Sequence, residues 1–277
     1  SYCRWGSITP TFEMVEAFEY QDGSEGKIDI GQSFETTYEM FQGKDPRFLA
    51  SIYVPGSSLL GSTMQFQRGL ILKDGSKYYA QSAPGPSYLL ETYIDPETQR
   101  KDTIFGKDGG TYTGDASKTG FNIRKFVNEN LKTEAQWDFG KTETSFPIFR
   151  LAEVYLNLAE AAVEMGKYQT EAFEAIKKIR DRAGVVTPFA VVDVEKVRHE
   201  RQVELAFEGH RFWDMKRWRI AHLPVDQGGL NGFRGAGLHP FFDLRIRKYV
   251  FEVANDLPKR QRVFTEKNYY TKFSGND

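Results

Sequence analysis

The chain has 277 residues, enough for one or two domains with a substantial buried core. Apolar residues make up 40% and charged residues 27%, a globular composition that excludes a largely disordered or membrane-embedded chain. Lys and Arg total 37 against 38 Asp and Glu, which gives a net charge of −1. Proteins that attract nucleic acid through its phosphates are usually basic, so we expect no nucleic acid partner.

The cysteine content and the apolar runs do not identify the cellular compartment of the protein. The single cysteine, Cys3, excludes an internal disulfide, and we interpret it as a free thiol because no apolar run precedes it. No window approaches the roughly 18 consecutive apolar residues that a membrane helix needs. The first residues also lack the charged-then-apolar pattern of a signal peptide.

Residues 1–145 predict short elements separated by many turns. One brief helix is expected at Pro10–Phe18, since Pro suits a first helical turn and Asp22-Gly23 ends the segment. Residues 106–120 hold five glycines and no apolar period, so we expect a loop there. Short extended runs between turn formers are expected at Phe48–Val54, Met64–Leu72, Lys77–Gln81 and Phe121–Val127.

Helical periodicity begins at Pro147, and it predicts a helix to about Met165 with Gly166 as its C-terminal cap. Most of this helix is apolar, so it must be covered on more than one side. Its polar residues form one narrow stripe, at Glu153, Asn157, Glu160 and Glu164.

A second helix is expected after Lys167-Tyr168, ending at Gly184. The unit from Leu151 to Gly184 has 34 residues, the length of a tetratricopeptide repeat, although it carries only part of that repeat's residue pattern. One such unit cannot bury its own faces, so neighbouring elements must cover it.

A third helix is predicted to begin at Asp193 as N-cap, with Gly209 permitting a break before another short helix. Loop character returns at about Leu223, and the alternation in Leu244–Phe251 predicts a strand or extended arm. We therefore divide the chain into a loop-rich segment with hairpins (1–145), a helical core (146–219) and an irregular C-terminal segment (220–277).

Aromatic residues in the short helix recur at helical spacing, which is typical of core packing. We interpret Phe207, Phe212, Trp213 and Trp218 in this way. Charged residues beside them are expected to form structural ion pairs; they are Glu200, Arg201, Glu204, Glu208, Arg211 and Arg217.

Metal, cofactor and catalytic patterns are absent from the sequence. His199 and His210 are too far apart for a two-ligand helix motif, and Asp108 and Asp115 lack the spacing of a calcium loop. No carboxylates can be assigned as a glycosidase pair, and there is no nucleophile elbow. We expect a protein that is not an enzyme and has no metal or cofactor.

Two runs closely resemble the SusD/RagB family. The first extends from Phe146 to Ala162 (FPIFRLAEVYLNLAEAA), and the second from Glu200 to Trp218 (ERQVELAFEGHRFWDMKRW). The helix ending at Gly184 separates them by the expected distance, and weaker similarities lie at Thr11–Glu19, Asp45–Phe48 and Gly120–Phe126.

The resemblance implies a mainly α, tetratricopeptide-like α/α superhelix decorated with long loops and small β-hairpins. It also implies a surface-exposed lipoprotein of the outer membrane that binds oligosaccharide and passes it to a TonB-dependent (SusC-like) outer-membrane transporter. Family members are longer, and their N-terminal half carries a signal peptide, a lipidated cysteine and further helical repeats. We therefore expect the chain to correspond to the C-terminal portion of such a protein.

Sugar binding should depend on aromatic residues in irregular segments, because flat rings stack on the apolar faces of pyranoses. We favour Tyr2 and Trp5, which precede the first helix, and then Trp137. The other candidates are Tyr78, Tyr79, Tyr88 and Tyr112.

Three functions remain open from the sequence. The first is non-catalytic binding of an oligosaccharide or polysaccharide nutrient at the cell surface. The second is a helical-repeat adaptor that binds a protein without binding glycan. The third is a glycan-processing enzyme.

Overall fold

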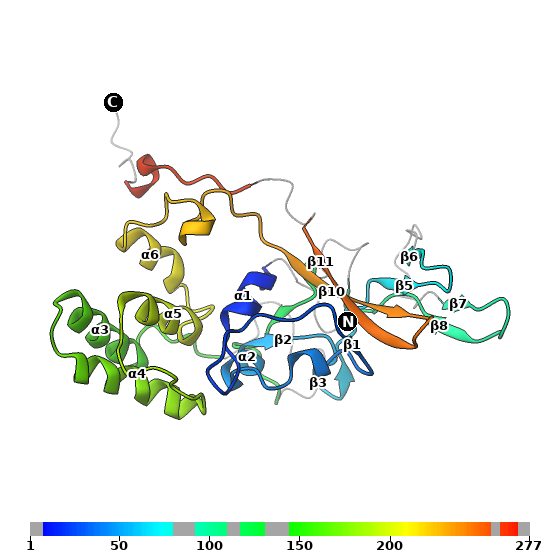
Figure 1. Ribbon diagram of the computed structural model, residues 1–277, viewed down its shortest axis with the longest axis horizontal. Helices are drawn as coiled ribbons and strands as arrows, with labels where there is room; N and C mark the ends of the chain where they lie inside the picture. Colours follow the sequence, from blue (N-terminus) through cyan, green and yellow to red (C-terminus); the bar gives the residue numbers. More distant parts are fainter. Residues whose placement is uncertain (1–7, 80–91, 110–116, 131–143, 256–260, 271–277) are drawn as a thin grey trace.

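The computed structural model describes residues 8–79, 92–109, 117–130, 144–255 and 261–270. Helices α3 to α6 gather at one end of the molecule and a β-sheet occupies the other, with α1 and α2 between them (Figure 1). Of the described residues, 31% are helical and 19% lie in strands or bridges. The expectation of a mainly α chain is therefore not confirmed, because a five-stranded sheet is added to the helices.

The sheet has the strand order β1-β11-β10-β5-β6. Its centre is the antiparallel hairpin of β10 (Gly237–Asp243) and β11 (Lys248–Ala254). β1 (Ser33–Phe34) pairs antiparallel with β11, and β5 (Gly69–Ile71) pairs parallel with β10 and antiparallel with β6 (Lys77–Tyr79).

The predicted strand Leu244–Phe251 is wrong in its position, because the chain turns within it. Asp243 accepts a backbone hydrogen bond from Arg245 (2.9 Å) on its carboxylate, and Arg247 adopts a left-handed conformation (φ 59°) that reverses the chain. The first strand of the hairpin instead begins at Gly237, inside the glycine-rich stretch that we had expected to be loop.

Three small strand pairs complete the loop-rich half. They are β2 (Ile52–Tyr53) with β9 (Asn122–Ile123), β3 (Ser58–Leu59) with β4 (Ser62–Thr63), and β7 (Thr92–Ile94) with β8 (Lys101–Thr103).

The brief helix predicted near the start of the chain is present as α1 (Phe12–Ala17). The extended run predicted from Phe48 is partly wrong, since helix α2 covers Pro46–Ser51. Asp45 caps α2 by accepting from the Arg47 backbone N–H at 2.8 Å, and Pro46 suits the first turn. The local caps thus favour a helix at these positions, although the residues of the run have a high β-propensity.

Four longer helices follow: α3 (Leu151–Glu164), α4 (Gln169–Ala183), α5 (Val194–Glu204) and α6 (His210–Arg217). Helix α3 begins four residues after its predicted start at Pro147, whereas the predicted caps of α4 and α5 are confirmed. Gly184 ends α4 in a left-handed conformation, and Asp193 caps α5 by accepting from the Lys196 backbone N–H. Short 3-10 turns lie at Glu39–Phe41, Val225–Gln227 and Glu266–Tyr269. No described helix is both long and apolar enough to span a bilayer.

One hydrophobic core joins the loop-rich half to the end of α5, and a second lies within the helical half. Phe41 lies at the centre of the first, where its ring contacts Phe48 (6.0 Å), Phe121 (5.9 Å) and Phe251 (5.9 Å between centroids). The second lies between α3, α4 and α5 and includes Leu156 and Ile176, both fully buried. Ring contacts from four separate segments explain why short, irregular elements are fixed in place.

The outer face of α3 stays apolar and exposed, with Leu151, Val154 and Leu158 retaining 63%, 41% and 46% of their accessible surface. This agrees with the expectation that the helix pair cannot bury both faces by itself. The core interpretation of Phe212 and Trp213 is wrong for this chain, since they are 46% and 65% exposed. Helix α6 is short and buries mainly the side that carries Asp214 and Met215.

A buried row of carboxylates joins the helices to the loop-rich half. Glu200, Glu204 and Glu208 follow one another at steps of four and are 1%, 3% and 5% exposed. Arg47 on α2 contacts Glu200 (2.5 Å) and Glu204 (2.9 Å), and Arg150 before α3 contacts Glu204 (2.6 Å) and Glu208 (2.8 Å). The expected structural role of these acidic residues is confirmed.

Candidate functional site

The aromatic residues predicted to stack on sugar divide into two sets. Tyr2, Trp5, Trp137, Tyr88 and Tyr112 lie outside the described residues. Tyr78 and Tyr79 lie on the edge strand β6 and are 40% and 42% exposed.

Tyr78 and Tyr79 do not form one platform, because neighbouring side chains of a strand point to opposite faces. The Tyr78 ring packs against Tyr93 on β7, with centroids 5.8 Å apart. The Tyr79 ring packs edge-on against Phe241 on β10, with centroids 5.6 Å apart and planes at 88°. The two tyrosines therefore lie on opposite faces of the sheet.

Gly69 on β5 explains how the Tyr79 and Phe241 rings meet. It is the register partner of Tyr79 on one side and of Phe241 on the other. A Cβ at this position would lie 2.6 Å from the Tyr78 carbonyl oxygen and 3.1 Å from the Phe241 ring. The missing side chain leaves the space in which the two rings approach across the strand.

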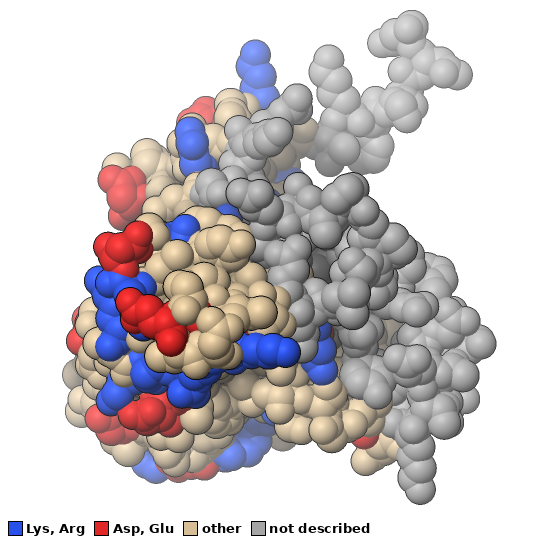
Figure 2. Space-filling model, turned by 90° about the vertical axis from the view of Figure 1, so that its right-hand side faces the viewer, with Lys and Arg blue, Asp and Glu red and all other residues tan. Residues whose placement is uncertain are grey.

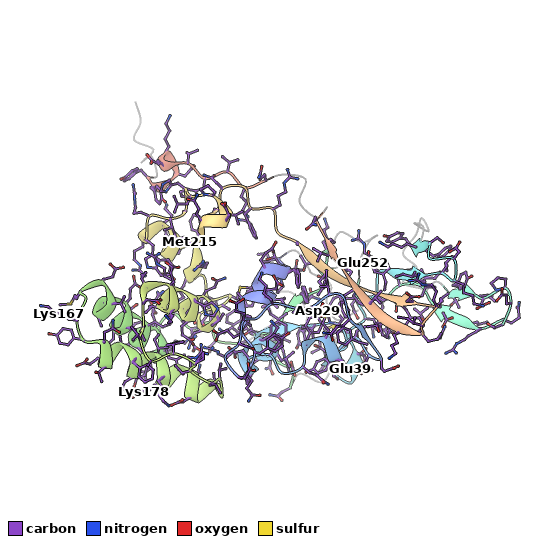
Figure 3. All side chains as sticks on the ribbon, viewed as in Figure 1. Asp29, Glu39, Lys167, Lys178, Met215 and Glu252 are labelled. Atoms are coloured by element: carbon purple, nitrogen blue, oxygen red, sulfur yellow. The ribbon has the colours of Figure 1, made fainter. Side chains whose placement is uncertain are left out.

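A hollow of about 510 Å³ opens beside these rings. This volume lies within the range of small-molecule sites. Around Tyr79 and Phe241 it is lined by polar side chains from other segments: Arg68 before β5, Glu252 on β11 and Asn255 after it. Figure 3 labels Glu252 on the hairpin. The sheet pairing thus brings three distant segments to one surface.

Charges at the rim of the hollow are paired. The Lys77 Nζ lies 2.7 Å from Glu252 Oε2 and 5.8 Å from the Phe241 ring centroid. The hydrogen bond from Lys77 to Glu252 raises the pKa of the lysine above its ordinary value. On the end of the molecule that faces the viewer in Figure 2, Lys and Arg lie beside Asp and Glu.

The side chains around the hollow can exchange hydrogen bonds with hydroxyl-rich ligands. In the part of the chain that the structure describes, no group of three or more His, Cys, Asp or Glu is arranged to hold a metal ion. Among the described residues that line the hollow, Glu252 is the one carboxylate, whereas a glycosidase pair needs two. A guanidinium, an amide and a carboxylate beside aromatic rings can donate to and accept from sugar hydroxyls.

Sequence reasoning missed four residues of this site: Arg68, Phe241, Glu252 and Asn255. Only Phe241 had a local signal, its place in the apolar pair Phe241-Phe242, and the preceding glycines obscured it. The others acquire their positions from strand register.

These features define a class of helix-and-sheet proteins with an open, aromatic and polar surface hollow. The family model described as the SusD family matches residues 1–276, so the chain belongs to the SusD family.

Solved structures agree with this assignment of family. A SusD-like protein of Bacteroides fragilis is 27% identical and superposes with a TM-score of 0.60, covering 96% of this chain and 44% of that one. A SusD-like carbohydrate binding protein of the same species is 24% identical, with a TM-score of 0.58, covering 94% of this chain and 45% of that one, and supports the fold alone. The chain thus spans less than half the length of these relatives.

Two curated relatives are SusD-like proteins of Formosa agariphila. One is 31% identical over 101 residues, which cover 32% of this chain and 20% of the relative. The other is 39% identical over 80 residues, which cover 26% of this chain and 15% of the relative.

Proposed function

We propose that the protein binds oligosaccharide or polysaccharide segments without catalysis, in the hollow beside Tyr79 and Phe241. The observation that carries the proposal is the Tyr79–Phe241 pair, formed across Gly69 at the edge of an open hollow with polar side chains. Tyr79 keeps 42% of its surface exposed, so its ring is available to a ligand.

In this proposal, stacking and hydrogen bonding contact different parts of the sugar. The exposed part of the Tyr79 ring contacts an apolar sugar face, while Asn255 and Glu252 exchange hydrogen bonds with hydroxyl groups. Polar desolvation offsets much of the gain, so we expect a dissociation constant of roughly micromolar to millimolar. Tyr2, Trp5 and Trp137 stay further stacking candidates.

Family membership supports the wider role. One of the solved relatives is described as a carbohydrate binding protein. On this proposal the whole protein is a lipid-anchored component of the outer-membrane surface, and it delivers the glycan to a TonB-dependent transporter. The hollow is open at the surface of the described residues, which is consistent with such delivery.

Substitution of the two neighbouring tyrosines tests the proposal. Affinity electrophoresis against a panel of neutral polysaccharides should show retardation that Tyr79→Ala weakens about three- to tenfold, from the loss of one stacking contact. Tyr78→Ala is the matched control, since it removes the same side chain, with nearly the same exposure, from the opposite face of β6. Unchanged retardation of Tyr79→Ala, or equal losses in both variants, would contradict the assignment of this hollow.

The exposed apolar face of α3 favours a second candidate, a helical-repeat adaptor. Leu151, Val154 and Leu158 offer a surface suited to another protein chain. Retention of a purified transporter partner together with no retardation by any glycan in the panel would favour the adaptor. Release of reducing sugar from a glycan would instead indicate an enzyme.

A further inference from the structure

A second hollow, the α6 hollow, lies between helix α6 and the 3-10 turn Glu266–Tyr269. It has a volume of about 500 Å³, and Trp213, Lys216, Arg219 and Tyr269 lie around it. Figure 3 labels Met215 on α6 and Glu252 on β11, in separate parts of the molecule, so this hollow is distinct from the one beside Tyr79.

Two arginines of the α6 hollow have their charge neutralised by buried carboxylates. Arg201 Nε lies 2.7 Å from Asp214, and Arg217 lies 3.1 Å from the other oxygen of the same carboxylate. Arg217 also pairs with Glu160 on α3. These pairs attach α6 to α5 and α3, and they neutralise the charges of both arginines.

Lys216 and Arg219 differ, because neither forms an ion pair with a carboxylate among the described residues. The Lys216 Nζ lies over the Trp213 ring, 5.3 Å from its centroid. The Arg219 guanidinium lies over the Tyr269 ring at 3.9 Å. The surface of the hollow thus carries two cations that lie over aromatic rings.

Arg219 follows α6 and lies over a ring that hydrogen bonds hold in place. Its backbone adopts a left-handed conformation (φ 60°), which is uncommon for a residue with a side chain. The Tyr269 ring beneath it is fixed through its hydroxyl, which lies 2.8 Å from His222 Nδ1 and accepts from the His222 backbone N–H at 3.1 Å. Among the described residues the guanidinium makes one hydrogen bond, to the Tyr270 hydroxyl at 3.5 Å. Most of its N–H donors are therefore available.

Trp213 adds a flat apolar surface to this charged site. It is 65% exposed, and its ring borders the same hollow as the two cations. An exposed indole beside a guanidinium and an ammonium is complementary to a pyranose ring that carries an anionic group.

We propose that the α6 hollow binds an acidic saccharide, one whose sugar carries a carboxylate or a sulfate. Arg219 and Lys216 contact the anionic group, and Trp213 stacks on the sugar ring. An anionic membrane surface is less suited to this geometry, because the cations border a hollow rather than project from a convex surface. The proposal goes beyond binding at the Tyr79 hollow. It assigns an anionic ligand to the protein, which the protein's own net charge of −1 does not suggest.

The test measures binding of the whole chain to polygalacturonate, to chondroitin sulfate and to a neutral glucan by affinity electrophoresis and calorimetry. Polygalacturonate carries only carboxylates, whereas chondroitin sulfate carries both carboxylates and sulfates, so binding to chondroitin sulfate alone would indicate that the sulfate is recognised. We expect binding to at least one of them, weakening as salt increases, and a loss of about tenfold or more in the double variant Lys216→Gln, Arg219→Gln. Retention by a neutral glucan, which depends on the Tyr79 hollow, should be unchanged in this variant.

Lys178→Gln is the matched control, because the Lys178 Nζ also lies over an aromatic ring, Tyr155 at 5.3 Å, but outside the α6 hollow. Arg219→Lys should restore part of the affinity that Arg219→Gln removes, which a general loss of folding would not allow. Equal affinity for the acidic polymers in the wild type and the double variant would overturn the proposal. The proposal would also be overturned if neither acidic polymer bound. Binding of phosphatidylglycerol vesicles in that case would indicate an anionic membrane surface as the ligand instead.

Discussion

Arg47 on α2 donates to Glu204 on α5 across 2.9 Å, although 157 positions separate them in the chain. Glu204 also accepts from Arg150 and Arg182, both at 2.6 Å. One buried carboxylate therefore connects α2, the start of α3 and α4, and the position of the helices relative to the loop-rich half depends on it.

Replacing Glu204 by Gln should destabilise the protein by about 3 kcal/mol, because Arg47, Arg150 and Arg182 all lose one buried countercharge, although Arg47 keeps Asp45 and Glu200. Urea unfolding measures the loss as a lower midpoint. Asp181→Asn is the control: its partner Lys177 is on the same exposed helix face, so removal of that pair should cost less than about 0.5 kcal/mol. Similar losses in both variants would contradict the role of the buried row.

Acid should weaken the same contacts. Burial alone would raise the pKa of Glu204, but hydrogen bonds from Arg150 and Arg47 lower it below its ordinary value of 4.5, and Arg150 and Lys125 do the same for Glu208. A lowered pKa in the folded state contributes stability above the unfolded value, and this contribution is lost as the pH falls below about 4.5.

Thermal unfolding followed from pH 7 to pH 3 measures this effect. Glu204→Gln should show a smaller decline than the wild type, because one of the linked groups no longer titrates. A decline of the same size in both proteins would assign the acid sensitivity to other carboxylates.

Lys44 predicts a change of stability at alkaline pH. It is 3% exposed, and its ammonium donates to the carbonyl oxygens of Phe18 (2.9 Å) and Gly26. Burial lowers its pKa from 10.5 to about 8. Between these values the unfolded chain binds more protons than the folded one, so this group makes the protein more stable as the pH rises from about 8 toward 10.5.

The rise should be absent in Lys44→Met, which does not titrate. The measurement is the difference in unfolding free energy between wild type and variant at pH 7.5 and about pH 10, which removes the contribution of the tyrosines common to both. A difference that is independent of pH would contradict the lowered pKa.

Gly69→Ala should damage the candidate glycan site and the sheet together. Its Cβ would lie 2.6 Å from a backbone oxygen, so the strands must shift, at a cost of about 1–3 kcal/mol. We expect a lower urea midpoint and weaker retardation by neutral glycans. Gly31→Ala is the control, since the nearest atom there is the side-chain oxygen of Asp29 at 3.2 Å. Normal glycan retardation in Gly69→Ala would show that the Tyr79–Phe241 contact is not needed.

Local signals in the sequence were sufficient for the end of α4 and the start of α5, but not for α2. Asp193 and Gly184 were identifiable as caps because capping depends on a few neighbouring residues, and the structure places both as predicted. The same local reasoning failed for Trp213, whose helical spacing suggested core packing. Spacing shows which residues share a face of a helix, but burial depends on what packs against that face.

The family and the helical scaffold were thus determined by the sequence alone, since periodicity, caps and the two long runs are properties of contiguous residues. Only the tertiary structure decided that Tyr79 meets Phe241 while Tyr78 meets Tyr93. These contacts arise from strand register between distant segments, and a shift of one residue would exchange the two faces. The cations of the α6 hollow were decided in the same way, because whether a charge is paired depends on which carboxylates the fold brings near it.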